Sequence, residues 1–220
     1  MRIRLISLLA IVLALLPAVG EAKGKAAPDT ISARRAFVEL PQSAIDLLPV
    51  DLRMDMLDYF DADSLLQATN PLMGVSVLKR LTPDFLEGKV TPSSLMQLKV
   101  LRQKGGGDIV MTIYTIGEAG DTQESDVRFY DASLIELPAQ KFIKFPQLAD
   151  FFDTKGYHTS MREIEDMIPY YSVVFEADPD NSGLTARLAL GDILAVEDRE
   201  IVSLLMKPGI SYQWNGKQYK

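Results

Sequence analysis

Hydrophobic residues in the early part of the chain recur with the period of an α-helix. Within residues 49–60, apolar side chains fall at intervals that place them on one helical face: Leu52, Met56, Tyr59 and Phe60. Asp51 stands where an N-cap residue is expected. The pattern therefore predicts an amphipathic helix over residues 49–60, followed by a short helical turn over residues 64–68.

From residue 75 onward the pattern changes to the alternation of apolar and polar residues that is typical of β-strands. Turn-forming residues interrupt this alternation, most clearly at Gly105–Gly107. The predicted strands cover residues 75–77, 95–100, 109–116, 127–130 and 134–137. The connections between them are short, whereas a parallel crossover needs a dozen residues or more. We therefore expect an antiparallel meander.

The second half of the sequence again predicts helices followed by strands. Pro146 is suited to open a helix over residues 146–152. Ser160 and Glu163 have the spacing of a capping box for a helix over residues 160–168. The remaining predicted elements are strands over residues 170–176 and 184–190, a helix over residues 195–205 and a terminal hairpin around Asn215-Gly216.

Short similarities recur in the same order in the two parts of the chain. Residues 37–44 resemble residues 142–149 at an offset of 105, and two hairpin sequences follow each segment at differing offsets. An ancient duplication and a chance recurrence both explain this order. Either way the fold class is α+β, with helices packed on antiparallel meander sheets. We divide the chain into a first α+β half over residues 37–140 and a second α+β half over residues 141–220. If a duplication occurred, the two halves are tandem pseudo-repeats.

The first 22 residues have the three zones of a secretory signal peptide. Two arginines precede an apolar run over residues 5–19, and the small residues Gly20 and Ala22 offer cleavage sites. The run is shorter than the roughly 20 residues of a spanning helix, which disfavours an uncleaved anchor. We expect an exported protein, periplasmic or extracellular, with no membrane span after signal removal. Residues 23–36 are small and polar without periodicity, so we expect a flexible leader and order from Phe37.

Composition and charge then exclude several classes of function. The 220 residues are 47% hydrophobic and include no cysteine and one histidine. The absence of cysteine excludes disulfides, thiolate nucleophiles and a lipid anchor at a processed N-terminus. A net charge of −7 gives no basic footprint for nucleic acid. His158 is the sole imidazole and no G-x-S-x-G elbow is present, so we expect an exposed loop histidine, no cofactor and no catalytic set.

One acidic group lies on the predicted helix over residues 49–60. Asp55 and Asp58 are three residues apart and therefore share a helical face. A carboxylate pair of this kind suits acid–base chemistry on glycosides or the binding of a cation. We favour a solvated helix face, with Arg53 as the local counter-charge.

A second acidic group lies in the turn over residues 178–183. Asp178, Asp180 and Ser182 place oxygen atoms at positions 1, 3 and 5 of a calcium-loop pattern, and a glycine follows. Position 12 is Ala189 instead of glutamate. We therefore favour a hairpin turn without metal and keep the three residues as weak metal candidates.

Aromatic residues alternate near the end of the sequence. Tyr212 and Trp214 are suited either to stacking on a sugar or to packing across the sheet, and we favour packing. The candidates for a binding surface are therefore Tyr212 and Trp214, together with Asp55 and Asp58.

The sequence RMDMLDYF at residues 53–60 resembles an uncharacterised family of exported proteins from Bacteroidetes-type gut bacteria. Supporting segments span nearly the whole mature chain: FVELP at 37–41, NPLMG at 70–74, LTPD at 81–84 and ISYQWNG at 210–216. The resemblance implies an envelope-associated protein with a domain of unknown function, and it brings no activity. The helix-plus-meander halves are also loosely similar in architecture to the tandem modules of the β-lactamase-inhibitor-protein type.

These observations lead to one leading hypothesis and two alternatives. We favour a non-catalytic envelope protein that binds a protein or peptide partner through a sheet face or the acidic helix. The first alternative is a hydrolase that uses Asp55 with Asp58 or Asp178 with Asp180, which requires a desolvated carboxylate in a pocket. The second is a carrier of an apolar ligand, which requires an apolar cavity. A binding protein instead requires an exposed apolar or aromatic patch.

Overall fold

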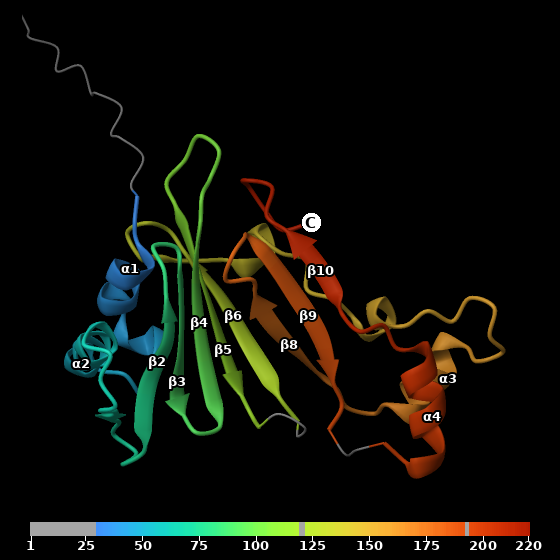
Figure 1. Cartoon of the computed structure of the whole chain (residues 1–220). Helices are drawn as coiled ribbons and strands as arrows, with labels where there is room; N and C mark the ends of the chain where they lie inside the picture. The colour runs from blue at the N-terminus through green and yellow to red at the C-terminus, as the bar shows by residue number, and fades with distance from the viewer. Residues whose placement is uncertain (1–29, 119–121, 192–193) are drawn as a thin grey trace, which may run out of the picture.

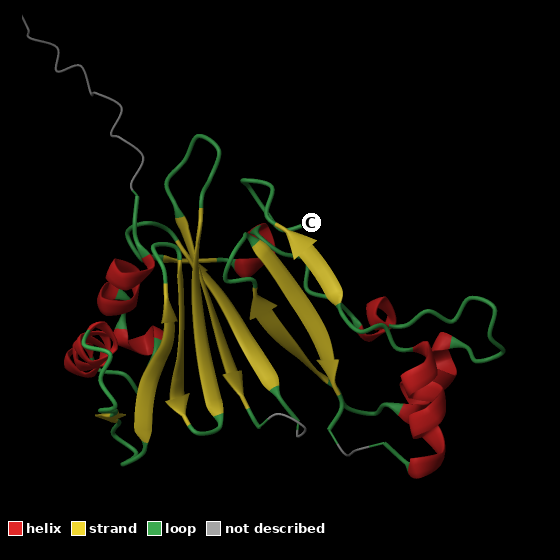
Figure 2. Ribbon diagram, viewed as in Figure 1, coloured by secondary structure: helices red, strands yellow, loops and turns green. Residues whose placement is uncertain are grey.

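The structure, a computed structural model, describes residues 30–118, 122–191 and 194–220. The predicted signal peptide and the leader up to residue 29 lie outside the described residues. A seven-stranded sheet carries two helices on one side and a three-stranded sheet on the other (Figure 1). Figure 2 shows that the helices α3 (Met161–Met167) and α4 (Val196–Leu205) lie together beyond the small sheet, far from the first two. All strand pairs within the two sheets are antiparallel, which confirms the predicted α+β class.

Two helices, α1 (Ala33–Glu39) and α2 (Val50–Asp61), cover one face of the large sheet, with a 3₁₀ turn over Gln42–Ala44 between them. α2 confirms the predicted helix, although Pro49 is its N-cap and Asp51 lies in its first turn. α1 begins inside the predicted flexible leader, so the prediction of order only from Phe37 is wrong. Ser32 caps α1 by accepting a hydrogen bond from the Arg35 amide, and the small apolar face of α1 is buried.

The large sheet is a meander in which each strand pairs with its neighbour in sequence. Its strands are β1 (Ala68–Thr69), β2 (Val75–Leu81), β3 (Phe85–Thr91), β4 (Ser94–Leu101), β5 (Ile109–Ile116), β6 (Glu124–Tyr130) and β7 (Glu136–Leu137). The predicted turn over residues 64–68 is wrong because Ala68 begins β1. β3 was not predicted, since Gly88 and its charged neighbours interrupt the apolar alternation. Gly88 leaves room for close approach of the strands, since a Cβ there would lie only 3.0 Å from the Val77 carbonyl oxygen.

Two 3₁₀ turns follow β7, Ala139–Lys141 and Leu148–Phe151, and the second of them forms part of the helix predicted over residues 146–152. α3 (Met161–Met167) follows the predicted capping box of Ser160 and Glu163. The other elements are β8 (Ser172–Ala177), β9 (Gly183–Ala189), α4 (Val196–Leu205) and β10 (Ile210–Gln213). The three strands form a sheet in the order β10-β9-β8, and a bridge between Trp214 and Tyr219 closes the predicted terminal hairpin.

Two hydrophobic clusters occupy the two faces of the large sheet. The cluster under α1 and α2 contains Phe37, Met56 and Leu98, whereas the opposite one joins Met111 and Phe129 of the large sheet to residues of the small sheet. The two halves of the chain therefore share a core across β5, β6 and β8. Their origin by duplication stays a prediction. None of the helices in the described ranges has the length and hydropathy needed to cross a membrane.

Candidate functional site

The face of the large sheet that carries the small sheet changes from apolar to polar across its width. Met111, Ile113 and Phe129 on β5 and β6 are buried beneath the small sheet. Towards β2 and β3 the same face carries the exposed side chains of Lys79 and Lys89. Burying unpaired ammonium groups beneath a second sheet would be costly. The small sheet therefore covers only part of this face, and a cleft remains beside it.

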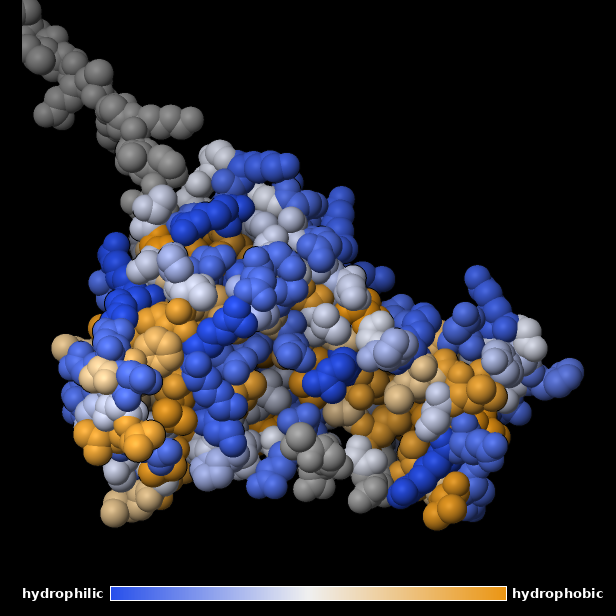
Figure 3. Space-filling view, viewed as in Figure 1, coloured by the Kyte–Doolittle hydropathy of each residue, from blue (hydrophilic) through white to orange (hydrophobic). Residues whose placement is uncertain are grey.

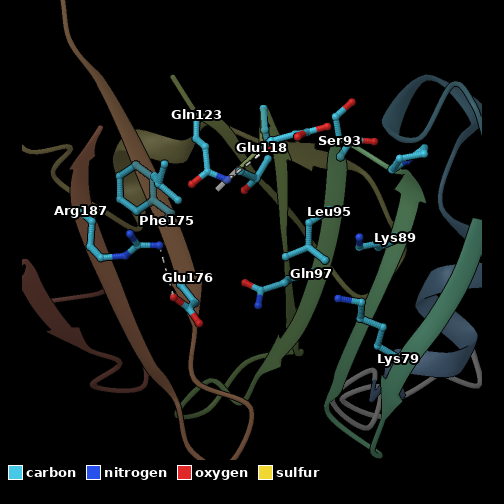
Figure 4. Close-up of a pocket in the computed structure, with 15 residues that line it drawn as sticks. Lys79, Lys89, Ser93, Leu95, Gln97, Glu118, Gln123, Phe175, Glu176 and Arg187 are labelled. Carbon is cyan, nitrogen blue, oxygen red and sulfur yellow. Dashed lines mark hydrogen bonds and ion pairs between the residues drawn. The ribbon is translucent and has the colours of Figure 1, made fainter. Parts of the chain in front are cut away.

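This cleft has a volume of about 620 Å³. Strands β2, β3 and β4 supply Lys79, Lys89 and Gln97 to one wall, and β8 and β9 supply Glu176 and Arg187 to the other (Figure 4). Glu118 and Gln123, from the connection between β5 and β6, stand at one end (Figure 4). The cleft is thus walled by strands from both halves of the chain.

Gln97 joins the two sheets at the base of the cleft. Its side chain is 4% exposed, and its Oε1 atom accepts a hydrogen bond of 3.0 Å from the Ala177 amide. Its Nε2 atom donates to Glu87 at 2.8 Å. Ser125 Oγ similarly accepts from the Phe175 amide at 3.0 Å. Because β8 is an edge strand, these side chains satisfy amides that a further strand would otherwise bind.

Lys99 fixes the turn between β8 and β9 to the large sheet. Its side chain is 1% exposed, lies 3.0 Å from the carboxylate of Asp84 and donates to the carbonyl of Pro179 at 3.3 Å. Burial alone would raise the pKa of Asp84, but the Lys99 ammonium and the Thr82 hydroxyl hold it below its ordinary value. A second ion pair, between Arg80 and Asp180, reinforces the attachment.

Two lysines give the cleft unpaired positive charge. Lys79 and Lys89 point into it (Figure 4), and no ion pair forms at either ammonium group within the described part of the chain. On the other wall, Arg187 lies 3.8 Å from Glu176, and both side chains are about half exposed. An exposed pair at this distance is weakly held. Arg187 is therefore available to an anionic ligand together with the lysines.

The acidic helix lies away from this cleft. Asp55 and Asp58 are exposed on α2, which covers the opposite face of the large sheet. The prediction that Arg53 neutralises them is wrong, because Arg53 is fully buried and donates at 2.6 Å to the carbonyls of both Leu40 and Leu48. The carbonyls at the end of α1 need such donors. Burial lowers the pKa of the Arg53 guanidinium.

The candidate calcium loop is the turn between β8 and β9. The Asp178 carboxylate accepts a hydrogen bond from the Asp180 amide at 2.8 Å and another from Asn181, and these bonds hold its pKa below the ordinary value. Asp180 is paired with Arg80, and Ser182 is half-buried. The oxygen atoms at positions 1 and 3 therefore have partners within the protein. The described residues contain no cluster of three or more potential metal-ligating side chains.

Tyr212 and Trp214 lie at the end of β10, and His158 lies on a loop in another part of the chain. Trp214 packs against Tyr219 with ring centroids 5.4 Å apart, and its Nε1 atom donates to the Arg102 carbonyl at 2.9 Å. Tyr212 is half-buried and lines a second cavity, where burial and then Asp150 raise its pKa. His158 is exposed on the loop before α3. The neighbouring Tyr212 and Trp214 therefore pack within the protein at the end of β10, and His158 lies on a separate loop.

Apolar side chains are exposed elsewhere on the surface. Leu65, Leu72 and Met73 are 99%, 66% and 85% exposed on the segments that flank β1. In the view of Figure 3, hydrophobic residues gather over α2 and the loops near β1, while polar residues predominate over the central strands. The binding hypothesis expects such a patch.

The sequence analysis did not identify the residues of the cleft, namely Lys79, Lys89, Gln97 and Arg187. A usable signal was present in the run over residues 95–100, where Gln97 and Lys99 occupy alternate positions of an otherwise apolar strand. Two inward-facing polar residues on one side of a strand indicate a polar contact there.

Comparisons with known proteins give a family and a fold. No curated protein matches the chain. The fold is similar to that of a solved domain of an uncharacterized protein from Porphyromonas gingivalis W83, with a TM-score of 0.72 and 16% sequence identity over 85% of this chain and 96% of that chain. The family model described as "Protein of unknown function (DUF3256)" matches residues 29–219. The resemblance to an uncharacterised family is thereby confirmed, and the chain belongs to the DUF3256 family of proteins of unknown function.

Proposed function

We propose that this protein is a non-catalytic binding protein whose inter-sheet cleft holds an acidic segment of a protein or peptide partner. The observation that carries the proposal is the pair of unpaired ammonium groups of Lys79 and Lys89 in the cleft, with Arg187 on the opposite wall. Carboxylates bound by such groups form charge-assisted hydrogen bonds, which are stronger than neutral ones. Three cationic side chains line the cleft against the two carboxylates of Glu118 and Glu176, whereas the protein is acidic overall, so the cleft is more positive than the average of the protein.

The shape and lining of the cleft favour an extended segment over a compact ligand. It lies between strands, and the side chains of Ser93 and Gln123 provide neutral polar groups along it. A peptide in extended conformation exposes backbone amides and carbonyls that such groups can bind. The charged side chains then select for acidic residues of the partner.

The two alternative functions receive less support. The carboxylates suggested for a hydrolase are either exposed on α2 or engaged in the turn between β8 and β9, and none of the four lines the cleft. The inter-sheet cleft and a second cavity of about 660 Å³ are open and include charged residues in their lining, whereas a carrier of apolar ligands needs an enclosed apolar cavity.

We also propose that the protein is exported to the periplasm or beyond the cell. The support is the signal-peptide pattern of residues 1–22. N-terminal sequencing of the protein from its native host would test export, because the mature chain should begin after Gly20 or Ala22. An N-terminus at Met1 would contradict the proposal.

Binding of acidic peptides tests the proposed cleft. The probe is a fluorescent ten-residue oligoglutamate, and the protein is residues 23–220. We expect the double variant Lys79→Glu/Lys89→Glu to bind it at least about tenfold more weakly than the wild type, since two attractive charges become repulsive. Affinity should also fall as salt is raised.

A matched control separates the cleft from net charge. Lys155→Glu/Lys217→Glu makes the same change in charge at two exposed lysines outside the cleft, and it should bind nearly as well as the wild type. Equal losses in the two double variants, or no binding of oligoglutamate by the wild type, would falsify the proposed cleft function.

A further inference from the structure

A second cavity, of about 660 Å³, lies between β10 and the segment over residues 140–150. Its volume is within the range of roughly 300–1,000 Å³ that is usual for sites of small molecules. Apolar and aromatic side chains form part of its wall, among them Ile143, Ile210 and Tyr212. Such a wall can bury the apolar body of a ligand.

Charged side chains lie beside this apolar wall. Lys144, Lys207 and Lys220 line the cavity together with one carboxylate, that of Asp150. The Asp150 carboxylate accepts a hydrogen bond from the Gln147 amide at 2.8 Å, and Lys207 donates to the backbone carbonyl of Asp150 at 2.8 Å. The lining side chains therefore carry a net charge of +2 (three ammonium groups less one carboxylate), in a protein that is negative overall.

Tyr212 can add a neutral donor to these ammonium groups. Its hydroxyl makes a hydrogen bond of 3.5 Å to the Lys144 carbonyl, which is at the long limit for such a bond. Burial and then the nearby Asp150 raise the pKa of this hydroxyl, so it keeps its proton at neutral pH. A ligand oxygen that approaches it can accept a shorter bond.

We infer that this second cavity binds a small amphipathic carboxylate, with its apolar body against Ile143, Ile210 and Tyr212 and its carboxylate at Lys144. The site is separate from the inter-sheet cleft, and no described residue lines both. It needs no metal and no covalent step. The combination of an apolar wall with excess positive charge discriminates against neutral and cationic molecules of the same size.

The chain contains a built-in reporter for this cavity. Trp214 is its single tryptophan, and its ring centroid lies 5.4 Å from that of Tyr219, which lines the cavity. A ligand that contacts Tyr219 changes the surroundings of the indole ring. Tryptophan fluorescence therefore responds to occupation of this site without any added label.

Titration with octanoate, octanol and octylamine tests the inference. These probes share one chain length and differ in charge. We expect a saturable change in Trp214 fluorescence with octanoate at a Kd below about 1 mM, and binding of octanol and octylamine at least about tenfold weaker. Acetate, which has the charge without the apolar body, should give no saturable change at the same concentrations.

Two lysine variants locate the response. Lys144→Glu should weaken octanoate binding about tenfold, whereas Lys155→Glu, on an exposed loop away from the cavity, should leave it unchanged. The Lys144 side chain makes no described hydrogen bond, so this variant should fold normally, which circular dichroism checks. Absence of a saturable change with octanoate, equal binding of octanol, or equal effects of the two variants would each overturn the inference.

Discussion

The two faces of the seven-stranded sheet are covered in different ways. On one face, α1 and α2 close an apolar cluster, within which the buried Arg53 binds carbonyls. On the other face, the small sheet is attached partly through the polar side chains of Gln97, Ser125 and Lys99. The first face is closed, and the second leaves a charged cleft. The comparison shows that the packing of apolar side chains closes one face, whereas polar attachment of the small sheet leaves part of the other face open.

Loss of Arg53 should produce the largest change in stability. Arg53→Met keeps a long apolar side chain but leaves the carbonyls of Leu40 and Leu48 buried without donors. We expect a loss of more than about 3 kcal/mol in the free energy of unfolding, since hydrogen bonds from charged donors are each worth about 1.5–3 kcal/mol. Urea denaturation followed by circular dichroism measures it.

The exposed Arg162 on α3 provides the control for this change. Arg162→Met should shift the free energy of unfolding by less than about 0.5 kcal/mol, as is usual for surface substitutions. A loss below about 1 kcal/mol in Arg53→Met would show that the closed face does not depend on the buried arginine.

Loss of Gln97 should have a smaller and more local effect. Gln97→Leu removes the acceptor of the Ala177 amide and the donor to Glu87. We expect a loss of about 1–3 kcal/mol, because a buried amide loses its partner. Hydrogen exchange should accelerate in β8 while amides of α2 keep their protection. The exposed Gln67 provides a matched control, and faster exchange in α2 than in β8 would contradict the assigned role.

Acidification should produce the smallest effect, again on the cleft face. Asp84 has a folded-state pKa below its ordinary value, so the folded state binds its proton less readily than the unfolded state does. Its contribution to stability is therefore present above about pH 4 and is lost as the pH falls through the lower folded-state pKa. The side chain is 45% exposed, so we expect less than about 1 kcal/mol.

A variant without the ammonium group tests this pH dependence. Lys99→Met should flatten the loss of stability between about pH 4 and pH 2, measured by urea denaturation at each pH. An unchanged slope in the variant would mean that the pair of Lys99 and Asp84 does not contribute to it.

Much of the fold could be predicted from local patterns. The helix over residues 49–60, the strand over residues 109–116 and the capping box at Ser160 all depend on residues close in sequence, and the structure contains each of them. The sequence pattern did not predict α1, because alanines supply much of its buried face and give little periodic signal. The pattern did not predict β3 either, because Gly88 and charged residues interrupt its apolar alternation. Pairing with β2 on one side and β4 on the other keeps this strand in the sheet.

The candidate site was less accessible to sequence reasoning. The predicted carboxylates, Asp55 with Asp58 and Asp178 with Asp180, are conspicuous because they are close in sequence. The cleft instead joins Lys79 and Lys89 to Glu176 and Arg187, which are about a hundred residues away along the chain. The burial of Arg53 could not be predicted from the local sequence either, because a charged residue on a helix is ordinarily exposed. Arg53 is buried because the end of α1 places carbonyl groups beside its guanidinium.

The sequence by itself determined the α+β class, the antiparallel pairing and the acidic character of this protein, because these follow from periodicity, short connections and composition. The tertiary structure alone decided which face of the large sheet is closed and where the cleft lies. Those outcomes depend on the docking of β8 across β4 to β6, through hydrogen bonds between groups 50 to 80 residues apart. A local pattern can indicate that a strand makes a polar contact, but it does not identify the partner, because the partner lies far away along the chain.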